Sequence, residues 1–280
     1  MEARSPAGFW VNKSTSKSNL INHLMAFLTI TNEPDLEAGE HISAAIREHT
    51  GDVVCLLSGG SALDIVKYID PYKHCFHQDC KEANTLDAGP TKCQRSECRT
   101  IFMMGDERVS GESEINNYLQ LVARYPEHPV ISRTINTAAL ENETEKNFAI
   151  RIENIFIETL TSLKNPKIIF ILGVGTDGHT AGIFPLDEVS FRRVYQDDLT
   201  YVPVKLEGLT IDSRASFTPN WILNNVDEVI GYIVGANKKE ILAELSSETK
   251  NLNERPAELL NLHKRVHIFT DQDITSEDDI

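Results

Sequence analysis

The sequence lacks any apolar run long enough to cross a membrane. The best candidate, residues 20–30, is eleven residues long and contains Asn22 and His23, whereas a membrane helix needs about 20 apolar residues. An excess of basic charge is missing too, because 27 Lys and Arg stand against 42 Asp and Glu, for a formal net charge of -15. We therefore expect no nucleic-acid or membrane partner, and an anionic ligand would need locally placed Arg and Lys.

Cysteine is scarce, with five residues, and no secretion signal accompanies this odd number. We therefore expect a reducing compartment, the cytoplasm. Four of the cysteines have the spacing C-x4-C-x12-C-x4-C, namely Cys75, Cys80, Cys93 and Cys98. Three alternatives are open for them: a structural zinc site, reduced exposed thiols, or one disulfide formed on oxidation.

Repeats, low-complexity tracts and linkers are also absent, and an apolar content of 41% with 25% charged residues is ordinary for a globular protein. In a chain of 280 residues we expect one domain over residues 31–273. The four cysteines lie in a loop inserted at residues 71–99. We expect residues 1–30 to form an N-terminal extension and residues 274–280 an acidic tail.

Short β-branched runs alternate with helical spacing along this domain. We expect helices after Pro34, after Ser61 and over residues 140–163, and strands at residues 52–57, 99–104, 167–172, 229–234 and 265–269. Such alternation favours right-handed crossovers between parallel strands. The predicted fold class is α/β, with a single doubly wound, mostly parallel sheet that carries helices on both faces.

The most informative stretch is KIIFILGVGTDGHTAGIFP, residues 167–185. Its apolar half reads as a buried strand that ends at Gly173. Asp177 and His179 follow at the carboxyl end of that strand, where ligands bind in open α/β sheets. A carboxylate beside an imidazole can fix its tautomer or tune its pKa, which suits a general base near neutral pH. A surface histidine in a Gly-rich turn would explain a lone DGH equally well.

Other polar residues stand where strands end or helices begin. Residues 59–61, Gly-Gly-Ser, form a strand-to-helix turn typical of a phosphate cradle, although many α/β turns look alike. Residues 105–108, Gly-Asp-Glu-Arg, directly follow another buried strand. Arg214 follows an irregular stretch and Lys238 opens a predicted helix. Guanidinium is the best bidentate phosphate donor, but an isolated Arg is more often a surface salt-bridge partner.

The DGHTAGIFP segment resembles the signature of the 6-phosphogluconolactonases and, more distantly, that of the glucosamine-6-phosphate deaminases of the same superfamily. Other segments agree with this resemblance at matching places: Gly59-Gly60-Ser61, Asp106 with Arg108, Asn117-Tyr118, Arg214 with Ser216 and Thr218, and Lys238. The resemblance spans about residues 31–273, apart from the inserted loop, and implies the modified Rossmann fold of these enzymes.

The resemblance implies hydrolysis of 6-phospho-D-glucono-1,5-lactone to 6-phosphogluconate in the oxidative pentose phosphate pathway. His179 would be the base and Asp177 its orienting partner, with Asp106 and Arg108 at the carbonyl end of the pocket. The groups that would hold the substrate and its phosphate are Gly59, Gly60, Ser61, Asn117, Arg214 and Lys238. The scheme needs no cofactor or metal, and we expect a monomer or weak dimer.

Two departures keep other functions open. The family usually continues Gly-Gly-Ser/Thr with Thr-Pro, whereas this chain has Ala62-Leu63. The phosphate cradle is therefore one hydroxyl short, and a non-catalytic paralogue stays an alternative. The deaminases carry a Glu a few residues beyond their DGH, where residues 180–185 here read TAGIFP. A sugar-phosphate-sensing regulator would need a helix-turn-helix segment, for which the amino terminus offers no room.

Overall fold

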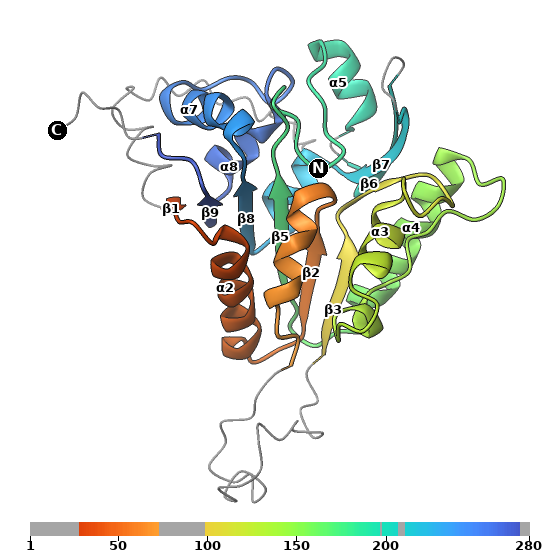
Figure 1. Ribbon diagram of the computed structural model, residues 1–280. Coiled ribbons are helices and arrows are strands. Elements are labelled where there is room, and N and C mark those ends of the chain that lie inside the picture. Colours follow the sequence, from red (N-terminus) through yellow and green to blue (C-terminus); the bar gives the residue numbers. More distant parts are fainter. Residues whose placement is uncertain (1–27, 73–98, 197, 207–210, 275–280) are drawn as a thin grey trace, which may run out of the picture.

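The centre of the molecule is a six-stranded parallel sheet in the order β1-β9-β8-β5-β2-β3 (Figure 1). The computed structural model describes residues 28–72, 99–196, 198–206 and 211–274. In sheet order the strands are Leu28–Ile30, Val266–Thr270, Glu228–Ile233, Lys167–Gly173, Val53–Leu57 and Thr100–Met104. The predicted doubly wound α/β fold is therefore confirmed.

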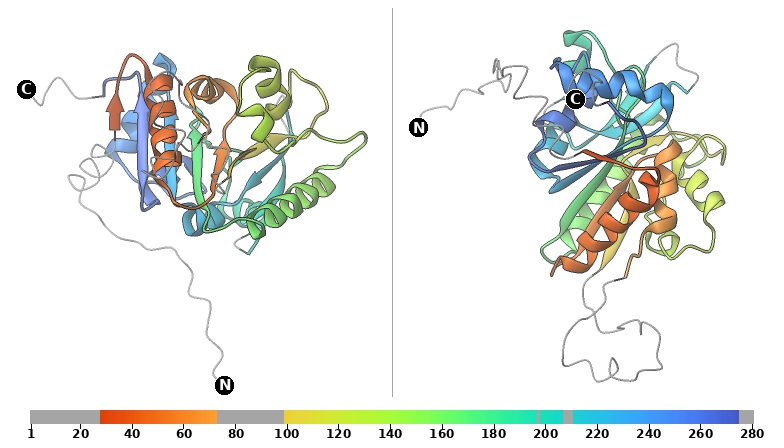
Figure 2. Two further views of the ribbon diagram at one scale, coloured as in Figure 1. Left: turned by 90° about the horizontal axis from the view of Figure 1, so that it is seen from below. Right: turned by 60° about the vertical axis from the view of Figure 1, so that its left-hand side comes forward.

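Both faces of this sheet are apolar and both are covered by helices. Along β2, Val53, Cys55 and Leu57 pack in one cluster, whereas Val54 and Leu56 pack in the other, as expected because side chains of a strand alternate between its faces. The first face packs against α2 (Pro34–Glu48), the 3-10 helix η1 (Gly60–Tyr68) and α3 (Asn117–Arg124). Figure 2 shows these elements and α4 (Glu145–Thr161) on opposite sides of the sheet.

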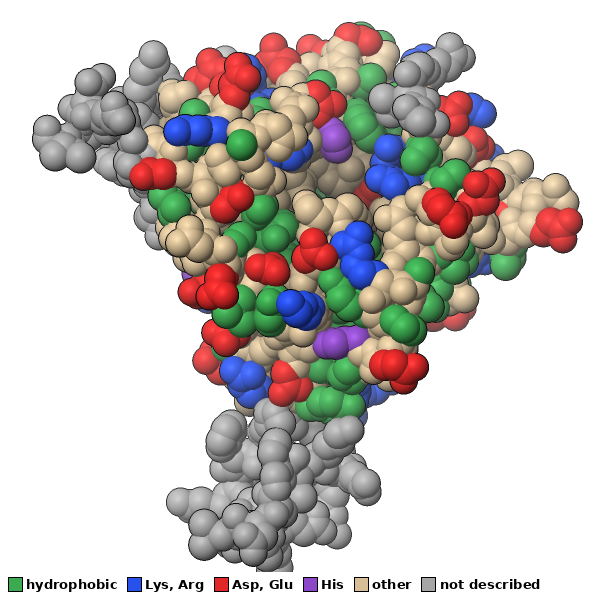
Figure 3. Space-filling view, in the orientation of Figure 1, with side chains coloured by type: hydrophobic (Ala, Val, Ile, Leu, Met, Phe, Trp, Pro, Cys, Tyr) green, Lys and Arg blue, Asp and Glu red, His purple; other side chains and the backbone are tan. Residues whose placement is uncertain are grey.

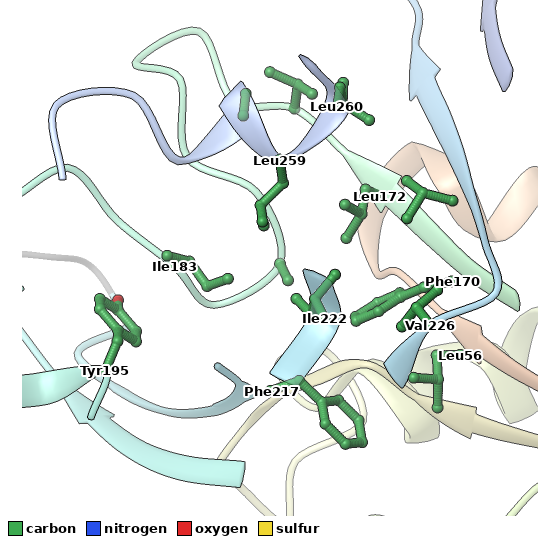
Figure 4. Packing of buried hydrophobic residues seen from close by; sticks show 14 of the residues in the cluster. Leu56, Phe170, Leu172, Ile183, Tyr195, Phe217, Ile222, Val226, Leu259 and Leu260 are labelled. Atoms are coloured by element: carbon green, nitrogen blue, oxygen red, sulfur yellow. The ribbon is translucent and has the colours of Figure 1, made fainter. Parts of the chain in front are cut away.

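The second face carries a larger cover. Figure 4 shows Leu56, Phe170 and Leu172 of the sheet directed towards side chains of this cover, among them Phe217, Ile222 and Leu259. The helices of this cover are α4 (Glu145–Thr161), α5 (Glu188–Val194), α6 (Pro219–Asn225), α7 (Lys239–Ser247) and α8 (Leu259–Leu262). Single 3-10 turns stand at Ile131–Arg133, Ala236–Lys238 and Pro256–Glu258.

A second, antiparallel sheet lies at the carboxyl end of β3 and was not predicted from the sequence. Its order is β4-β7-β6, from Asp106–Arg108, Ser213–Phe217 and Tyr201–Lys205. The register pairs Arg108 with Arg214 and Asp106 with Ser216. This small sheet therefore brings two of the segments that sequence analysis had singled out to one place.

Two predicted helices differ from those observed. The helix expected over residues 140–163 begins only at Glu145, because the side chain of Thr144 accepts a hydrogen bond from the backbone N–H of Asn147 and caps it. Leu140, the first residue of the predicted helix, lies before the cap and is 61% exposed. The helix expected after Ser61 is a 3-10 helix.

The sheet begins earlier than the predicted domain. Strand β1 pairs with β9 from Leu28 onwards, so the last three residues of the expected N-terminal extension belong to the sheet. The four cysteines of the inserted loop and residues 275–280 of the acidic tail lie outside the described residues. None of the helices in the described part of the chain has both the length and the apolar character needed to span a bilayer.

Candidate active site

The loop that follows β5 is closed by its own hydrogen bonds. The backbone N–H of Gly175 donates to the carbonyl of His179 at 2.8 Å, and that of Gly178 donates to Gly175 at 3.0 Å. Gly178 has a φ of +81°, which side chains with a Cβ rarely adopt. The hydroxyl of Thr180 donates to the carbonyl of Gly173 at 2.7 Å and ties the loop to the strand end. This local network fixes the backbone from which Asp177 and His179 project.

Asp177 and His179 form a hydrogen-bonded pair. Nδ1 of His179 lies 2.5 Å from Oδ1 of Asp177, and the backbone N–H of His179 donates to the same oxygen at 3.2 Å. The hydrogen bond with His179 lowers the pKa of Asp177 to about 2. An ionised Asp177 accepts the Nδ1 proton, so a neutral His179 carries its lone pair on Nε2. Both side chains are partly exposed, which leaves Nε2 able to exchange a proton with a ligand or water.

Gly175 is required by this pair. A Cβ at position 175 would overlap Nδ1 and Cε1 of His179 and Oδ1 of Asp177, so no larger residue fits without displacing both side chains. A Cβ at Gly173, two residues earlier, would meet no described atom within 4 Å. The two glycines therefore differ sharply in what they contribute to the loop.

Phe184 connects His179 to Arg214. Its ring is stacked with the imidazole of His179, with centroids 4.8 Å apart and planes 21° apart, and the guanidinium carbon of Arg214 lies 5.1 Å from the ring centroid. The backbone N–H of Phe184 donates to the hydroxyl of Tyr195 at 2.9 Å. Phe184 was not predicted to have a role, although its place in the same loop as His179 was a signal.

Opposite charges gather around a buried carboxyl. Burial raises the pKa of Asp106, while the positive charges of Arg214, Arg108 and His179 oppose that rise. Burial in turn lowers the pKa of Arg214, and the charge of Asp106 opposes that effect. Four residues from three separately predicted segments, Asp106 with Arg108, His179 and Arg214, therefore interact in one cluster.

Lys238 lies on the Asp177 side of this cluster. Partial burial lowers its pKa, and the charge of Asp177 opposes the shift. In the space-filling view, a hollow over the carboxyl ends of the strands contains a histidine side chain with Lys and Arg side chains around it (Figure 3). His179 and Arg214 contact the same Phe184 ring, and Lys238 interacts with the charge of Asp177, the partner of His179, so these three predicted residues lie on one side of the molecule.

Glu107 holds β4 against the start of α3. The buried carboxyl accepts four hydrogen bonds, two on each oxygen, from the backbone N–H groups of Arg108, Asn117 and Tyr118 and from the hydroxyl of Thr137. Burial raises the pKa of Glu107 to about 8, against the effect of these donors. Glu107 was not predicted to have a role of its own. Its position between Asp106 and Arg108, directly after a buried strand, was a signal.

Two buried polar atoms beside Asp106 lack a partner among the described residues, namely Oδ1 of Asn117 and Nε of Arg108. The amide nitrogen of Asn117 donates to the carbonyl of Asp106 at 3.1 Å, and Nη1 of Arg108 donates to the carbonyl of Ile115 at 3.3 Å. Since buried polar atoms are nearly always hydrogen-bonded, these two are candidates for contact with a ligand.

The Gly-Gly-Ser turn lies next to these atoms. A Cβ at Gly59 would overlap the side-chain amide of Asn117, and the hydroxyl of Ser58 accepts a hydrogen bond from the N–H of Gly173 at 3.4 Å. The turn after β2 therefore lies beside the end of β5. Gly60 has a φ of +66°, and Ser61 is exposed at the start of η1. Ser61 therefore lies near the other predicted residues because its turn does, and its side chain forms none of the contacts described here.

Arg255 supports the histidine loop from behind. It is 2% exposed, donates to Glu258 through Nε at 2.8 Å and to the carbonyl of Glu248 at 2.6 Å. A Cβ at Gly178 would lie 2.8 Å from Cγ of Arg255, and the backbone N–H of Ala257 donates to the carbonyl of Gly178 at 2.9 Å. The segment 255–257 therefore braces the loop, a role that the sequence did not indicate.

A family model described as glucosamine-6-phosphate isomerases/6-phosphogluconolactonase matches residues 36–269. The chain belongs to this family. The resemblance found in the sequence is thereby confirmed, and the match includes both the histidine loop and the small sheet.

Individual relatives of this glucosamine-6-phosphate isomerase/6-phosphogluconolactonase family are distant. A 6-phosphogluconolactonase of Borreliella burgdorferi is 28% identical over 177 residues, which cover 61% of this chain and 72% of the relative. A crystal structure of a 6-phosphogluconolactonase from Shewanella baltica matches with a TM-score of 0.62 at 17% identity, over 87% of this chain and 95% of that one. A monomeric glucosamine-6-phosphate deaminase matches with a TM-score of 0.61 at 18% identity, over 88% and 96%. The fold is thus common to both activities, so the site must distinguish them.

Proposed function

We propose that the protein hydrolyses 6-phospho-D-glucono-1,5-lactone to 6-phospho-D-gluconate. The observation that carries the proposal is that His179, oriented by the ionised Asp177, lies against the same ring as Arg214. A lactone carbonyl is reactive already, so a base for water, positive charge at the oxyanion and a grip on the phosphate suffice. The named 6-phosphogluconolactonase relative supports this choice of substrate.

In the proposed reaction, Nε2 of His179 takes a proton from water while the water oxygen attacks the carbonyl carbon. The charge that develops on the carbonyl oxygen is stabilised by a guanidinium, for which Arg108, with its unpartnered Nε, is suited. The bond between the carbonyl carbon and the ring oxygen then breaks, and the imidazolium of His179 returns its proton to the ring oxygen. Asp106 keeps the neighbouring guanidinium groups in place through its charge.

The phosphate would lie where positive charge and free N–H groups meet. Arg214 and Lys238 supply the charge, and the turn of residues 59–61 supplies backbone donors at the carboxyl end of β2. Asn117, packed against Gly59, offers its unpartnered oxygen to a substrate hydroxyl. The reaction would serve the oxidative pentose phosphate pathway, and we place it in the cytoplasm.

A deaminase of the same fold is the alternative function. The deaminases support their histidine with a Glu beyond the DGH, and residues 180–185 contain no carboxylate. Here the partner of His179 is Asp177, within the DGH itself. The lactonase assignment is therefore favoured over the deaminase.

One assay separates these functions. The disappearance of freshly generated 6-phosphogluconolactone is measured against its spontaneous hydrolysis, and ammonia release from glucosamine 6-phosphate is measured in parallel. We expect catalysed lactone hydrolysis and no ammonia. His179→Ala should lower turnover by at least about a hundredfold while leaving 6-phosphogluconate binding unchanged. Ammonia release, or a lactone rate no faster than the spontaneous one, would reject the proposal.

A further inference from the structure

A second cluster of polar side chains lies between helix α2 and strands β8 and β9. Nε2 of His41 is 2.8 Å from Oε1 of Glu228, and Nε2 of His267 is 3.7 Å from the same oxygen. The three donor atoms all lie within 4.8 Å of one another. The two imidazole rings are neighbours, with centroids 4.3 Å apart. None of these residues takes part in the reaction proposed above.

This cluster lies away from the candidate active site. Glu228 is the first residue of β8 and contacts Lys167, the first residue of β5. The histidine loop follows the other end of β5, after Gly173. Any ligand of the cluster is therefore separated from His179 by the length of the strand, and its binding does not depend on the proposed hydrolysis.

The geometry suits a tetrahedral metal ion. With zinc bonds of about 2.0–2.1 Å, neighbouring donor atoms of a tetrahedral site lie about 3.3 Å apart. The separations of 2.8 Å and 3.7 Å from the Glu228 oxygen lie on either side of that value. To bind an ion, the three donor atoms, now within 4.8 Å of one another, would have to reach this spacing by rotation of their side chains. Two histidines and one carboxylate are a donor set that zinc uses in proteins, with water in the fourth position.

The surroundings leave one carboxylate oxygen and the fourth position available. Lys167 binds the other oxygen of Glu228, Oε2, at 2.6 Å, so the carboxylate is held with Oε1 towards the histidines. A cavity of about 750 Å³ is lined by His41 and His267, so water can reach the cluster. Mg²⁺ and Ca²⁺ bind through several oxygen ligands, and here Lys167 already occupies one carboxylate oxygen and adds a positive charge nearby. An ion that forms strong bonds to imidazole, such as zinc, is less affected.

We propose that His41, Glu228 and His267 bind one Zn²⁺ ion. The ion replaces the hydrogen bond between His41 and Glu228 and bridges α2 to β8 and β9. Helix α2 is far from both strands in the sequence, so the ion acts as a cross-link between two neighbouring strands of the sheet and their covering helix. Zinc-loaded protein should therefore melt at a higher temperature than metal-free protein.

The test titrates ZnCl₂ into metal-free full-length protein by calorimetry. The background variant carries Ser at the four cysteines of the inserted loop, Cys75, Cys80, Cys93 and Cys98, so that their thiols contribute nothing. We expect one zinc ion per chain, and a melting temperature about 5 °C or more higher at a hundredfold excess of zinc over its dissociation constant. X-ray absorption should report nitrogen and oxygen ligands without sulfur.

Matched variants locate the ion. His41→Gln and His267→Gln should each weaken zinc binding at least about tenfold, whereas His128→Gln, whose ring lies beside Tyr125 outside the cluster, should bind zinc as the background protein does. His179→Ala should also retain zinc binding. Equal zinc affinity in the double variant His41→Gln/His267→Gln, or no binding by the folded background protein, would overturn the proposal.

Discussion

His179 and Arg214 lie against one aromatic ring, that of Phe184. The two residues come from the loop after β5 and from the middle strand of the small sheet. Because the ring is 6% exposed and its backbone is bonded to Tyr195, it is a rigid surface for both. The Phe184 side chain, which has no reactive group, therefore sets the separation between the proposed base and the guanidinium proposed to bind the phosphate.

Replacing Phe184 should impair both activity and stability. Phe184→Leu keeps an apolar side chain but removes the flat ring, so we expect kcat/KM to fall about tenfold and the free energy of unfolding to fall by about 1–2 kcal/mol. Phe156→Leu is the control, because this ring packs against Phe217 and Trp221 in the core. It should lose similar stability and keep its kcat/KM. Equal activity of the two variants would show that the ring does not position the site.

The two glycines at the start of the histidine loop give a sharper comparison. Gly175→Ala should lower kcat at least about tenfold, because its Cβ overlaps the His179 and Asp177 side chains. Gly173→Ala meets open space and should keep wild-type kcat. Steady-state kinetics of both variants, with unfolding curves to show that both fold, make the test. A fully active Gly175→Ala variant would mean that the Asp177–His179 pair is not needed for turnover.

Removing a positive charge from the proposed phosphate site should raise KM. Arg214→Gln and Lys238→Gln should each increase KM by about tenfold or more, with a smaller effect on kcat, since each loses a charge-assisted contact to the phosphate. Arg192→Gln removes an exposed charge that pairs with Glu188 on α5 and should leave KM unchanged. If the Arg214 and Lys238 variants instead lowered kcat and kcat/KM equally and kept the same KM, the lost contact would be one made only in the transition state.

Glu107 should make stability depend on pH. Its pKa is raised by burial from 4.5 to about 8, so between these values the folded protein holds a proton that the unfolded chain has released. The free energy of unfolding should therefore fall as pH rises from about 4.5 to about 8, and level off above. Urea unfolding at several pH values measures this slope.

The variant Glu107→Gln should lack that slope, because an amide does not titrate. At pH 5 it should also be about 1–3 kcal/mol less stable than wild type, since its NH₂ group faces a backbone donor that the carboxyl oxygen had satisfied. Glu112→Gln, an exposed neighbour, should keep the wild-type slope. The same slope in Glu107→Gln and wild type would assign the pH dependence to other groups.

The parallel sheet was predictable because its signals are local. The runs that form β2 and β5 are continuous and apolar, as strands covered on both faces must be. The small sheet gave no such signal: β4 is the polar tripeptide Asp106–Arg108 and pairs with β7 much later in the chain. Its pairing depends on tertiary contacts that periodicity does not record.

The site residues divide along the same line. Asp177, His179 and Arg108 were predicted as candidates because they follow strands or stand in a recognisable motif. Three residues were missed, namely Phe184, Glu107 and Arg255. Each acts by packing or by hydrogen bonds to backbone, and such contacts exist only in the folded structure. The His41, Glu228 and His267 cluster has no spacing signal, since it joins a helix to two strands.

The register that pairs Arg108 with Arg214 sets two guanidinium groups on directly opposed positions of β4 and β7. Charges of the same sign at such positions repel, and the charge of Arg108 does disfavour that of Arg214. Asp106 outweighs this repulsion at Arg214, but burial still disfavours the charge of that guanidinium, so an incoming phosphate ester or carboxylate would stabilise it. Substrate arrival should then tighten the small sheet itself, and its amide hydrogens should exchange more slowly in the presence of 6-phosphogluconate than in the empty enzyme.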